Sequence, residues 1–346
     1  MAEDHTASVS GHKVVPDDAV FCLPVRFIRS QMIVLRQRRS DPTTPISARE
    51  VKKLHERAAH LLRERLSGPN GSSETWEVLA PTSASTVFFV DGHPVSDAVG
   101  LKGKTFAASM LGMAVPSRIV SSVATIASKL EVVPYAIMSA PQSLAALTPQ
   151  REAILIDVGR DGTSVNLIRH SALMAVMWWP QGGEYFTINL ARTFHCLPEH
   201  AEELKRAYVA NLLSPEDVVL VKRALEKPMR EWFDSLVSVL RALADDHGHT
   251  ISVLLDERQT VAYHENVLPG RIFVTGGGSL LPDLVSAMHN LEAVAGIPFD
   301  RAVEIEPLGR FLGMRRPGQL LLIDMPRHPL GDLLASAIGL ATGVTW

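Results

Sequence analysis

The most regular pattern of apolar and polar positions lies between residues 151 and 190. Three β-prone apolar runs alternate there with short polar connections: Ala153–Val158, Ser164–Ile168 and Leu173–Trp179. Apolar runs of this length joined by short turns predict a β-meander. Gly182-Gly183-Glu184, which follows the third run, predicts the start of a helix.

Further strands and helices follow from the same kind of pattern. Alternating or continuous apolar positions predict strands at 19–23, 32–35, 76–79, 86–90, 105–115, 131–135, 271–274 and 320–323. Apolar positions at helical spacing predict helices over 48–66, 116–130, 142–147, 198–211, 215–246 and 332–341. Ser47 followed by Glu50 predicts a capping box at the first of these helices.

The composition is that of a globular protein with a sizeable core. The 346 residues suggest about two domains. The chain is 46% hydrophobic and 21% charged, and its net charge of −3 implies no general attraction to nucleic acid or membranes. Cys22 and Cys196 are too far apart for a metal motif, which indicates a reducing cytoplasm. No apolar run reaches the roughly 18 residues of a membrane span, and the polar N-terminus has no secretion signal.

One segment has a strong excess of positive charge. Residues 26–65 contain eleven Lys or Arg against four acids. We interpret the segment as a solvated basic face; the alternative is a surface for an acidic partner or anionic lipid.

A candidate phosphate site lies at the end of the first meander strand. Asp157 is followed by the glycine-bracketed turn Gly159–Gly162 and by Thr163. Glycines that take positive φ let backbone N–H groups approach anionic oxygens, and Asp157 could hold a water or Mg²⁺. An ordinary hairpin turn is the alternative.

A second glycine-rich turn ends the strand at 271–274. It comprises Gly276, Gly277, Gly278 and Ser279, and a helix is expected to open at Leu280–Asp283. Such a turn lets a flat ligand lie directly on the backbone. A merely tight strand-to-helix turn is the alternative.

Together, these two strand ends resemble the actin/Hsp70/sugar-kinase ATPase superfamily, which uses one such turn for phosphate and the other for adenosine. Ile154–Gly159 with Thr163 is similar to its second phosphate motif, and Phe273–Leu281 to its adenosine motif. Gln181–Glu184 with Thr187 and Ala191 resembles the stretch after the meander, and Ser336–Ala341 resembles the last connecting motif.

Within the superfamily the chain most resembles the FtsA/PilM branch. Pro45–Ser47, Val99–Gly103 and Ser117–Tyr135 resemble the inserted 1C (SHS2) domain and its return to the core. Ala201–Lys205 resembles the family's acid and lysine that face ribose and adenine. The resemblance implies ATP with Mg²⁺ as cofactor and Asp157 as a water-mediated Mg²⁺ ligand. It implies these cofactor-binding residues: Asp157, Gly159, Gly162, Thr163, Gly182, Gly183, Glu202, Lys205, Gly276, Gly277, Gly278 and Ser279.

The resemblance also implies an α/β actin-like ATPase fold, with ribonuclease H-like duplicated domains and an inserted SHS2 domain. We expect a disordered lead-in at 1–18, the SHS2-like domain at 19–116 and a remnant of domain 1A at 117–150. Domain 2A is expected at 151–328, with 2B inserted at about 198–269, and a terminal helix at 329–346 should return to domain 1A.

Departures from the family pattern lower the expected nucleotide affinity. Nothing before Phe21 supplies the first phosphate motif, so half of domain 1A is expected to be missing and hydrolysis to be slight. Arg160 could contact phosphate, whereas Asp161 would repel it. The strand at 131–135 would then expose an edge unless the N-terminal tail or a partner covers it. Leu333–Trp346 contains no Lys or Arg, so no direct membrane anchor is expected.

The leading functional prediction is an FtsA-like scaffold of bacterial cell division that links FtsZ to other divisome proteins at the septum. Its FtsZ contact would lie in the lobe at 198–269, and its self-association would be weak. The alternative is a PilM-like type IV pilus platform whose 1C cleft holds a peptide of an inner-membrane protein. An ATP-binding filament protein or kinase relative ranks last. We expect a cytoplasmic protein recruited to the inner face of the membrane through partners.

Overall fold

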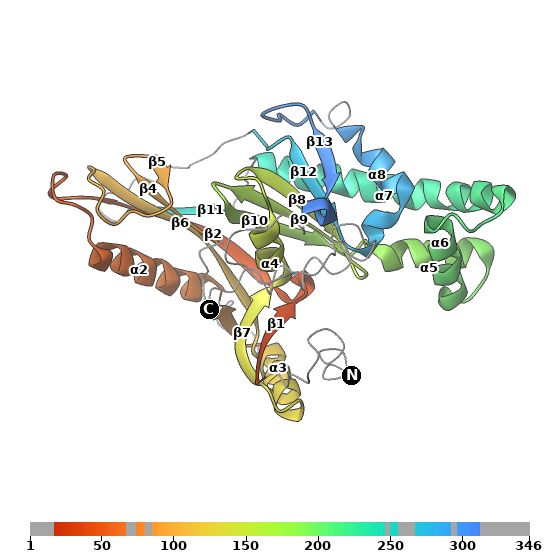
Figure 1. Cartoon of the computed structure of the whole chain (residues 1–346), viewed down its shortest axis with the longest axis horizontal. Coiled ribbons are helices and arrows are strands. Elements are labelled where there is room, and N and C mark those ends of the chain that lie inside the picture. Colours follow the sequence, from red (N-terminus) through yellow and green to blue (C-terminus); the bar gives the residue numbers. More distant parts are fainter. Residues whose placement is uncertain are drawn as a thin grey trace, which may run out of the picture.

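The computed structural model describes residues 17–66, 74–79, 85–245, 250–254, 267–291 and 296–311. Several predicted features lie outside these residues: most of the lead-in, the strand at 320–323, the helix at 332–341 and the motif Ser336–Ala341. The described strands form three sheets (Figure 1).

The central sheet contains the predicted meander. Its order is β10 (Ala172–Trp179), β9 (Thr163–Arg169), β8 (Ala153–Val158), β12 (Arg271–Thr275) and β13 (Glu304–Pro307). β8, β9 and β10 pair antiparallel, as predicted, whereas β12 lies parallel to both β8 and β13. The pattern did not predict β13. Because β8 is covered on both faces, its apolar run is continuous rather than alternating.

A six-stranded sheet lies to one side. Its order is β11 (Thr250–Leu254), β2 (Arg29–Arg38), β6 (Thr105–Pro116), β4 (Thr86–Val90) and β5 (His93–Val95), and β3 (Trp76–Leu79) also pairs with β6. The pattern did not predict β11, which follows the long helix α7 and pairs parallel with β2.

Helix α2 (Ala48–Leu66) packs on β2 and β6 and has the predicted bounds. It buries Leu54, Ala58 and Leu62, which are spaced at i, i+4 and i+8. The capping box is confirmed, because the Glu50 amide donates to Ser47 Oγ at 3.3 Å and the Ser47 amide donates to Glu50 Oε2 at 2.9 Å.

A two-stranded sheet joins the N-terminal strand to the middle of the chain. β1 (Asp18–Leu23) pairs parallel with β7 (Val133–Ser139), so the first strand lies along one edge of β7. The single turn η1 (Val25–Phe27) then connects β1 to β2. Helices α3 (Ser117–Lys129) and α4 (Ala140–Leu147) flank β7 in the chain. β7 begins later than predicted, because Glu131 takes a φ of 56° in the turn that follows α3.

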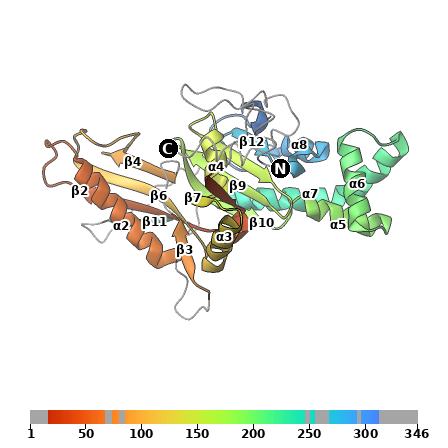
Figure 2. The ribbon, with the colours of Figure 1, turned by 60° about the horizontal axis from the view of Figure 1, so that its bottom comes forward.

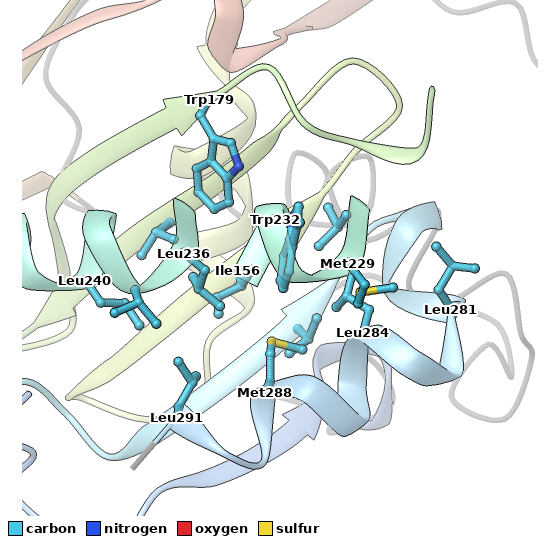
Figure 3. Packing of buried hydrophobic residues seen from close by; sticks show 14 of the residues in the cluster. Ile156, Trp179, Met229, Trp232, Leu236, Leu240, Leu281, Leu284, Met288 and Leu291 are labelled. Carbon is cyan, nitrogen blue, oxygen red and sulfur yellow. The ribbon is translucent and has the colours of Figure 1, made fainter. Parts of the chain in front are cut away.

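The remaining helices form the opposite end of the molecule from α2 (Figures 1 and 2). They are α5 (Gly183–Phe194), α6 (Pro198–Val209), α7 (Pro215–Asp245) and α8 (Pro282–Met288), with the short turns η3 (Gly277–Leu280) and η4 (Leu308–Phe311). Figure 3 shows α7 placing Trp232, Leu236 and Leu240 over Ile156 of β8 and facing Met288 of α8. This packing attaches the helical lobe to the central sheet.

The six-stranded sheet also contacts the central sheet, at β10 and at the turn between β9 and β10. Ser30 Oγ donates to Val176 O at 3.4 Å, and the rings of Phe89 and His170 meet edge to face at 5.8 Å. Within the described part of the chain, no helix combines the length and the apolar character needed to cross a membrane.

Candidate functional site

The two glycine-rich strand ends lie side by side. In the parallel pairing of β8 with β12, Thr275 is the register partner of Asp157. Gly276, the next residue, takes a φ of +86°. A Cβ atom there would lie 2.4 Å from Asp157 Oδ1 and 2.5 Å from Val158 O, so only glycine fits. The tertiary structure therefore brings together the turns that the sequence assigned to phosphate and adenosine.

Asp157 faces the junction between β8, β1 and α4. Leu155, two residues earlier on the same face, packs with Leu23 of β1 and Leu144 of α4. The surrounding protein desolvates the carboxyl group and raises the pKa of Asp157 to about 6. The group is therefore largely ionised at neutral pH and able to hold a water-bound cation.

Cys22 of β1 lies on the other side of this junction. Burial is the main cause that raises the pKa of its thiol to about 11, and the negative charge of Asp157 adds to it. The Cys22 Sγ and Ser143 Oγ atoms are 3.9 Å apart. The thiol is therefore neutral, and β1 comes close to the carboxylate of Asp157.

The β8–β9 hairpin holds its own shape through internal contacts. The Gly159 amide donates to Gly162 O at 3.0 Å. Neither glycine takes a positive φ, so the expectation based on that conformation was wrong. Gly162 is needed for a different reason: a Cβ atom there would lie 2.4 Å from both Trp178 Nε1 and Trp179 O.

Thr163 points into the protein rather than toward the hairpin tip. Its fully buried side chain donates from Oγ1 to Gln181 O at 2.6 Å. The same oxygen accepts a hydrogen bond from Trp232 Nε1 at 2.9 Å. This hydroxyl attaches the hairpin to α7 and is already engaged within the protein.

The first amides of α5 bind the hairpin. Gly183 N donates to Gly159 O at 2.8 Å, and Glu184 N donates to Arg160 O at 2.9 Å. A Cβ atom on Gly182 would lie 2.4 Å from Gly159 O, so the close approach requires glycine there. Gly182 and Gly183 therefore position the hairpin, and the amide of Gly183 is already bonded to it.

Glu202 and Lys205 of α6 are bound to each other beside the start of α5. Lys205 is 9% exposed, and its Nζ lies 2.6 Å from Glu202 Oε2, 2.7 Å from Thr187 Oγ1 and 2.9 Å from Gly183 O. Burial raises the pKa of Glu202, but the hydrogen bonds from Lys205 and Thr187 outweigh this effect and lower it. The two side chains that the resemblance assigns to ribose and adenine thus form an ion pair with each other, and Arg206 Nε also donates to Glu202 Oε1 at 3.0 Å.

Two ion pairs lie at the tip of the hairpin. Arg160 donates to Glu184 of α5 at 3.2 Å. Asp161 accepts from Arg26, which belongs to η1. Sequence reasoning named Arg160 and Asp161 but missed Arg26, because no local pattern signals a contact across 135 positions.

On the β12 side, the glycine turn is partly open. Gly277 is exposed, whereas Gly278 is buried, and a Cβ atom on it would lie 2.4 Å from Val158 Cγ1. Ser279 Oγ donates to Gly276 O at 2.7 Å and closes the turn.

These residues fit a phosphate group at the strand ends better than they fit a whole nucleotide. The carboxylate of Asp157 lies against Gly276, and the exposed backbone of Gly277 follows directly, which suits phosphate with a water-bound Mg²⁺. The polar groups expected for ribose and adenine are bonded to one another. In the described ranges, no group of three or more His, Cys, Asp or Glu could hold a metal ion directly.

No protein-family model matches this chain, and no curated protein matches it by sequence. Solved structures do match it. A PilM–PilN type IV pilus biogenesis complex aligns with a TM-score of 0.58 and 20% identity, over 95% of this chain and 80% of that chain.

Two further solved structures align at lower scores. The ethanolamine utilization protein EutJ from Carboxydothermus hydrogenoformans has a TM-score of 0.40 and 12% identity, over 85% of this chain and 99% of that chain. MreB 5 of Spiroplasma citri bound to AMPPNP has a TM-score of 0.39 and 11% identity, over 64% and 62%. The similarity to the PilM structure and the sheet arrangement agree with the sequence prediction: the chain has an actin-like ATPase fold.

Proposed function

We propose that this chain is a PilM-like assembly scaffold that binds a segment of a membrane-associated partner and turns over little or no ATP. The observation that carries the proposal is the state of the candidate nucleotide residues. The Thr163 hydroxyl, the Gly183 amide and the Lys205 ammonium each donate to another group of the protein. The fold keeps the architecture of an ATPase and uses several of its polar groups to join β8–β9, α5 and α6.

Little hydrolysis is expected from the groups that the described residues place at the strand ends. Phosphoryl transfer depends on a positioned metal ion and a positioned water molecule. Asp157 is the carboxylate at the strand ends that suits a water-bound cation, and the nearby Asp161 and Glu184 are paired with arginines. We therefore expect weak Mg-ATP binding at the strand ends that regulates assembly rather than drives turnover.

The partner is proposed from the likeness to PilM. In the matching solved structure, PilM is in complex with PilN, and the alignment covers 95% of this chain. A partner segment of this kind would recruit the chain to the inner face of the membrane. The SHS2-like sheet, β2 to β6 with α2, is the proposed holder of the segment.

The FtsA-like function, with FtsZ as partner, is the second candidate. Its support is local: the two stretches that resemble FtsA, Pro45–Ser47 and Val99–Gly103, lie side by side. Ile46 N donates to Leu101 O, and Gly100 N donates to Ile46 O, both at 2.8 Å. This pairing fixes one end of α2 to the loop before β6.

A binding experiment separates the two candidates. The purified chain is titrated against the PilN segment that contacts PilM and against FtsZ, both from the organism that supplies this chain. Leu101→Asp, beside the six-stranded sheet, and Leu212→Asp, between α6 and α7, change residues that are 40% and 78% exposed. The proposal predicts PilN binding that Leu101→Asp weakens at least tenfold and Leu212→Asp leaves unchanged.

The FtsA-like alternative predicts the opposite pattern. FtsZ would bind, and Leu212→Asp would weaken it, because the family resemblance places the FtsZ contact in the lobe at 198–269. A chain that binds neither probe, with both variants folded as judged by circular dichroism, would overturn both candidates.

A further inference from the structure

We propose that Arg26 is a phosphate-binding residue for a nucleotide and that, without nucleotide, the Asp161 carboxylate occupies its guanidinium group. We call this ion pair a self-bound anion site. The inference extends the proposed function by naming a phosphate-binding residue and a built-in competitor for it. Arg26 donates to Asp161 from η1, outside the two glycine-rich turns.

The positions of the two residues favour this role. Asp161 lies at the tip of the β8–β9 hairpin, which the amides of Gly183 and Glu184 hold in place. Arg26 follows β1, the strand whose Cys22 is close enough to Asp157 to sense its charge. Arg26 therefore approaches the hairpin from the β1 side, while Asp157 and Gly276 lie at the base of the hairpin.

The ion pair is accessible and easily exchanged. The side chains of Arg26 and Asp161 are 43% and 38% exposed. Exposed pairs contribute little to stability because water and salt screen them. A guanidinium group binds phosphate through two parallel hydrogen bonds and carries a permanent charge, so phosphate is a strong competitor for a single carboxylate.

The charges around the tip are balanced without a ligand. Arg26 faces Asp161, and Arg160 faces Glu184. A phosphate group that takes over Arg26 leaves Asp161 unpaired beside a second negative charge. Asp161 should therefore lower the affinity for phosphate twice, by occupying Arg26 and by repelling the ligand.

The exchange would also connect the site to the six-stranded sheet. η1 is the direct link between β1 and β2, and β2 carries the paired strands β6 and β11. When Arg26 moves from Asp161 to a phosphate group, η1 loses its ion pair with the hairpin. Nucleotide binding would in this way alter the position of β2, which belongs to the sheet proposed to hold the partner segment.

The test compares the direction in which two substitutions in the full chain change the affinity for phosphate ligands. In an ion pair that does not touch the ligand, Arg26→Gln and Asp161→Asn change only the net charge nearby, and 300 mM salt screens most of the resulting shift in affinity. In a self-bound anion site the two variants act oppositely, and their shifts persist at 300 mM salt. We expect Arg26→Gln to weaken binding of Mg-ATP and of inorganic triphosphate about fivefold or more, and Asp161→Asn to strengthen it about threefold or more. The measurement is isothermal titration calorimetry at 50 and 300 mM salt.

A matched control comes from another exposed ion pair. Lys52 and Glu56 of α2 are 3.9 Å apart, and Lys52→Gln and Glu56→Gln should leave both affinities unchanged. Shifts of the same sign for the Arg26 and Asp161 variants, no shift in either, or shifts that disappear at 300 mM salt would refute the inference. So would the absence of binding of both probes to the wild type and to Asp161→Asn. Because the PilN and FtsZ titrations need no nucleotide, this result would leave the proposed scaffold function standing.

Discussion

Gly276 and Asp157 are packed against each other at the ends of two adjacent parallel strands. A single methyl group on Gly276 would lie 2.4 Å from Asp157 Oδ1. The two turns, which lie about 115 residues apart in the sequence, therefore form one site. Any residue larger than glycine at position 276 would collide with the Asp157 carboxylate.

Gly276→Ala should be strongly destabilising. It combines a positive φ with a clash against Asp157 Oδ1 and Val158 O. Gly100→Ala is the matched control, because Gly100 has a φ of +85° and nothing within 4 Å of the added Cβ. Backbone strain alone costs about 1 kcal/mol, and the clash should raise the loss at Gly276 to about 3 kcal/mol or more. Urea denaturation measures both, and equal losses would show that the contact with Asp157 is unimportant.

Asp157→Asn should change how stability depends on pH. Desolvation raises the pKa of Asp157 from 3.8 to about 6, so the folded state holds the proton more tightly than the unfolded state. Stability therefore falls as the pH rises through this interval, and the loss is complete above pH 6. At pH 7.5 the variant should be more stable than the wild type, by at most about 3 kcal/mol for a shift of about two pKa units.

The two proteins should converge near pH 3.5, where both carry a neutral group at 157. Thermal unfolding at pH 3.5, 5 and 7.5 provides the comparison. Asp234→Asn on the exposed side of α7 controls for the loss of one carboxylate. A wild type that is more stable than Asp157→Asn at pH 7.5 would mean that the carboxylate is stabilised rather than desolvated.

Lys205→Met should destabilise the protein by about 1–3 kcal/mol, because it breaks the buried contact and leaves Glu202 with the exposed Arg206 as its remaining cationic partner. The double variant Glu202→Gln/Lys205→Met should recover much of this loss. Lys52→Met, whose side chain is 77% exposed in the wild type, should change stability by less than about 1 kcal/mol. A double variant as unstable as the single one would show that Lys205 acts through packing alone.

Thr163→Val should cost about 1–3 kcal/mol, because it removes the acceptor of Trp232 Nε1 and leaves a buried N–H group unpaired. The emission of Trp232 should also shift as its hydrogen bond is lost. Thr193→Val on α5 is the control, since that hydroxyl is exposed and donates to Asn189 O. If Thr163→Val is as stable as the wild type, the hydrogen bonds of the Thr163 hydroxyl do not stabilise the fold.

Local features of this chain could be predicted accurately. The β8–β10 meander and helix α2 with its Ser47–Glu50 capping box depend on residues within a few positions of one another. Strands β11 and β13 were missed. Each gains its place from a distant strand, β2 or β12, and a pattern within five residues carries no information about that partner.

The candidate site shows the same division. The sequence by itself determined that glycines follow β8 and β12, and hence where a backbone can approach an anion. Only the tertiary structure decided which polar groups are left to bind a ligand. Lys205 donates to Gly183 across 22 positions, and Arg26 donates to Asp161 across 135 positions. Short-range propensities and turn chemistry act within a few residues. Long side chains find partners set by the packing of whole sheets and helices, which no short stretch of sequence specifies.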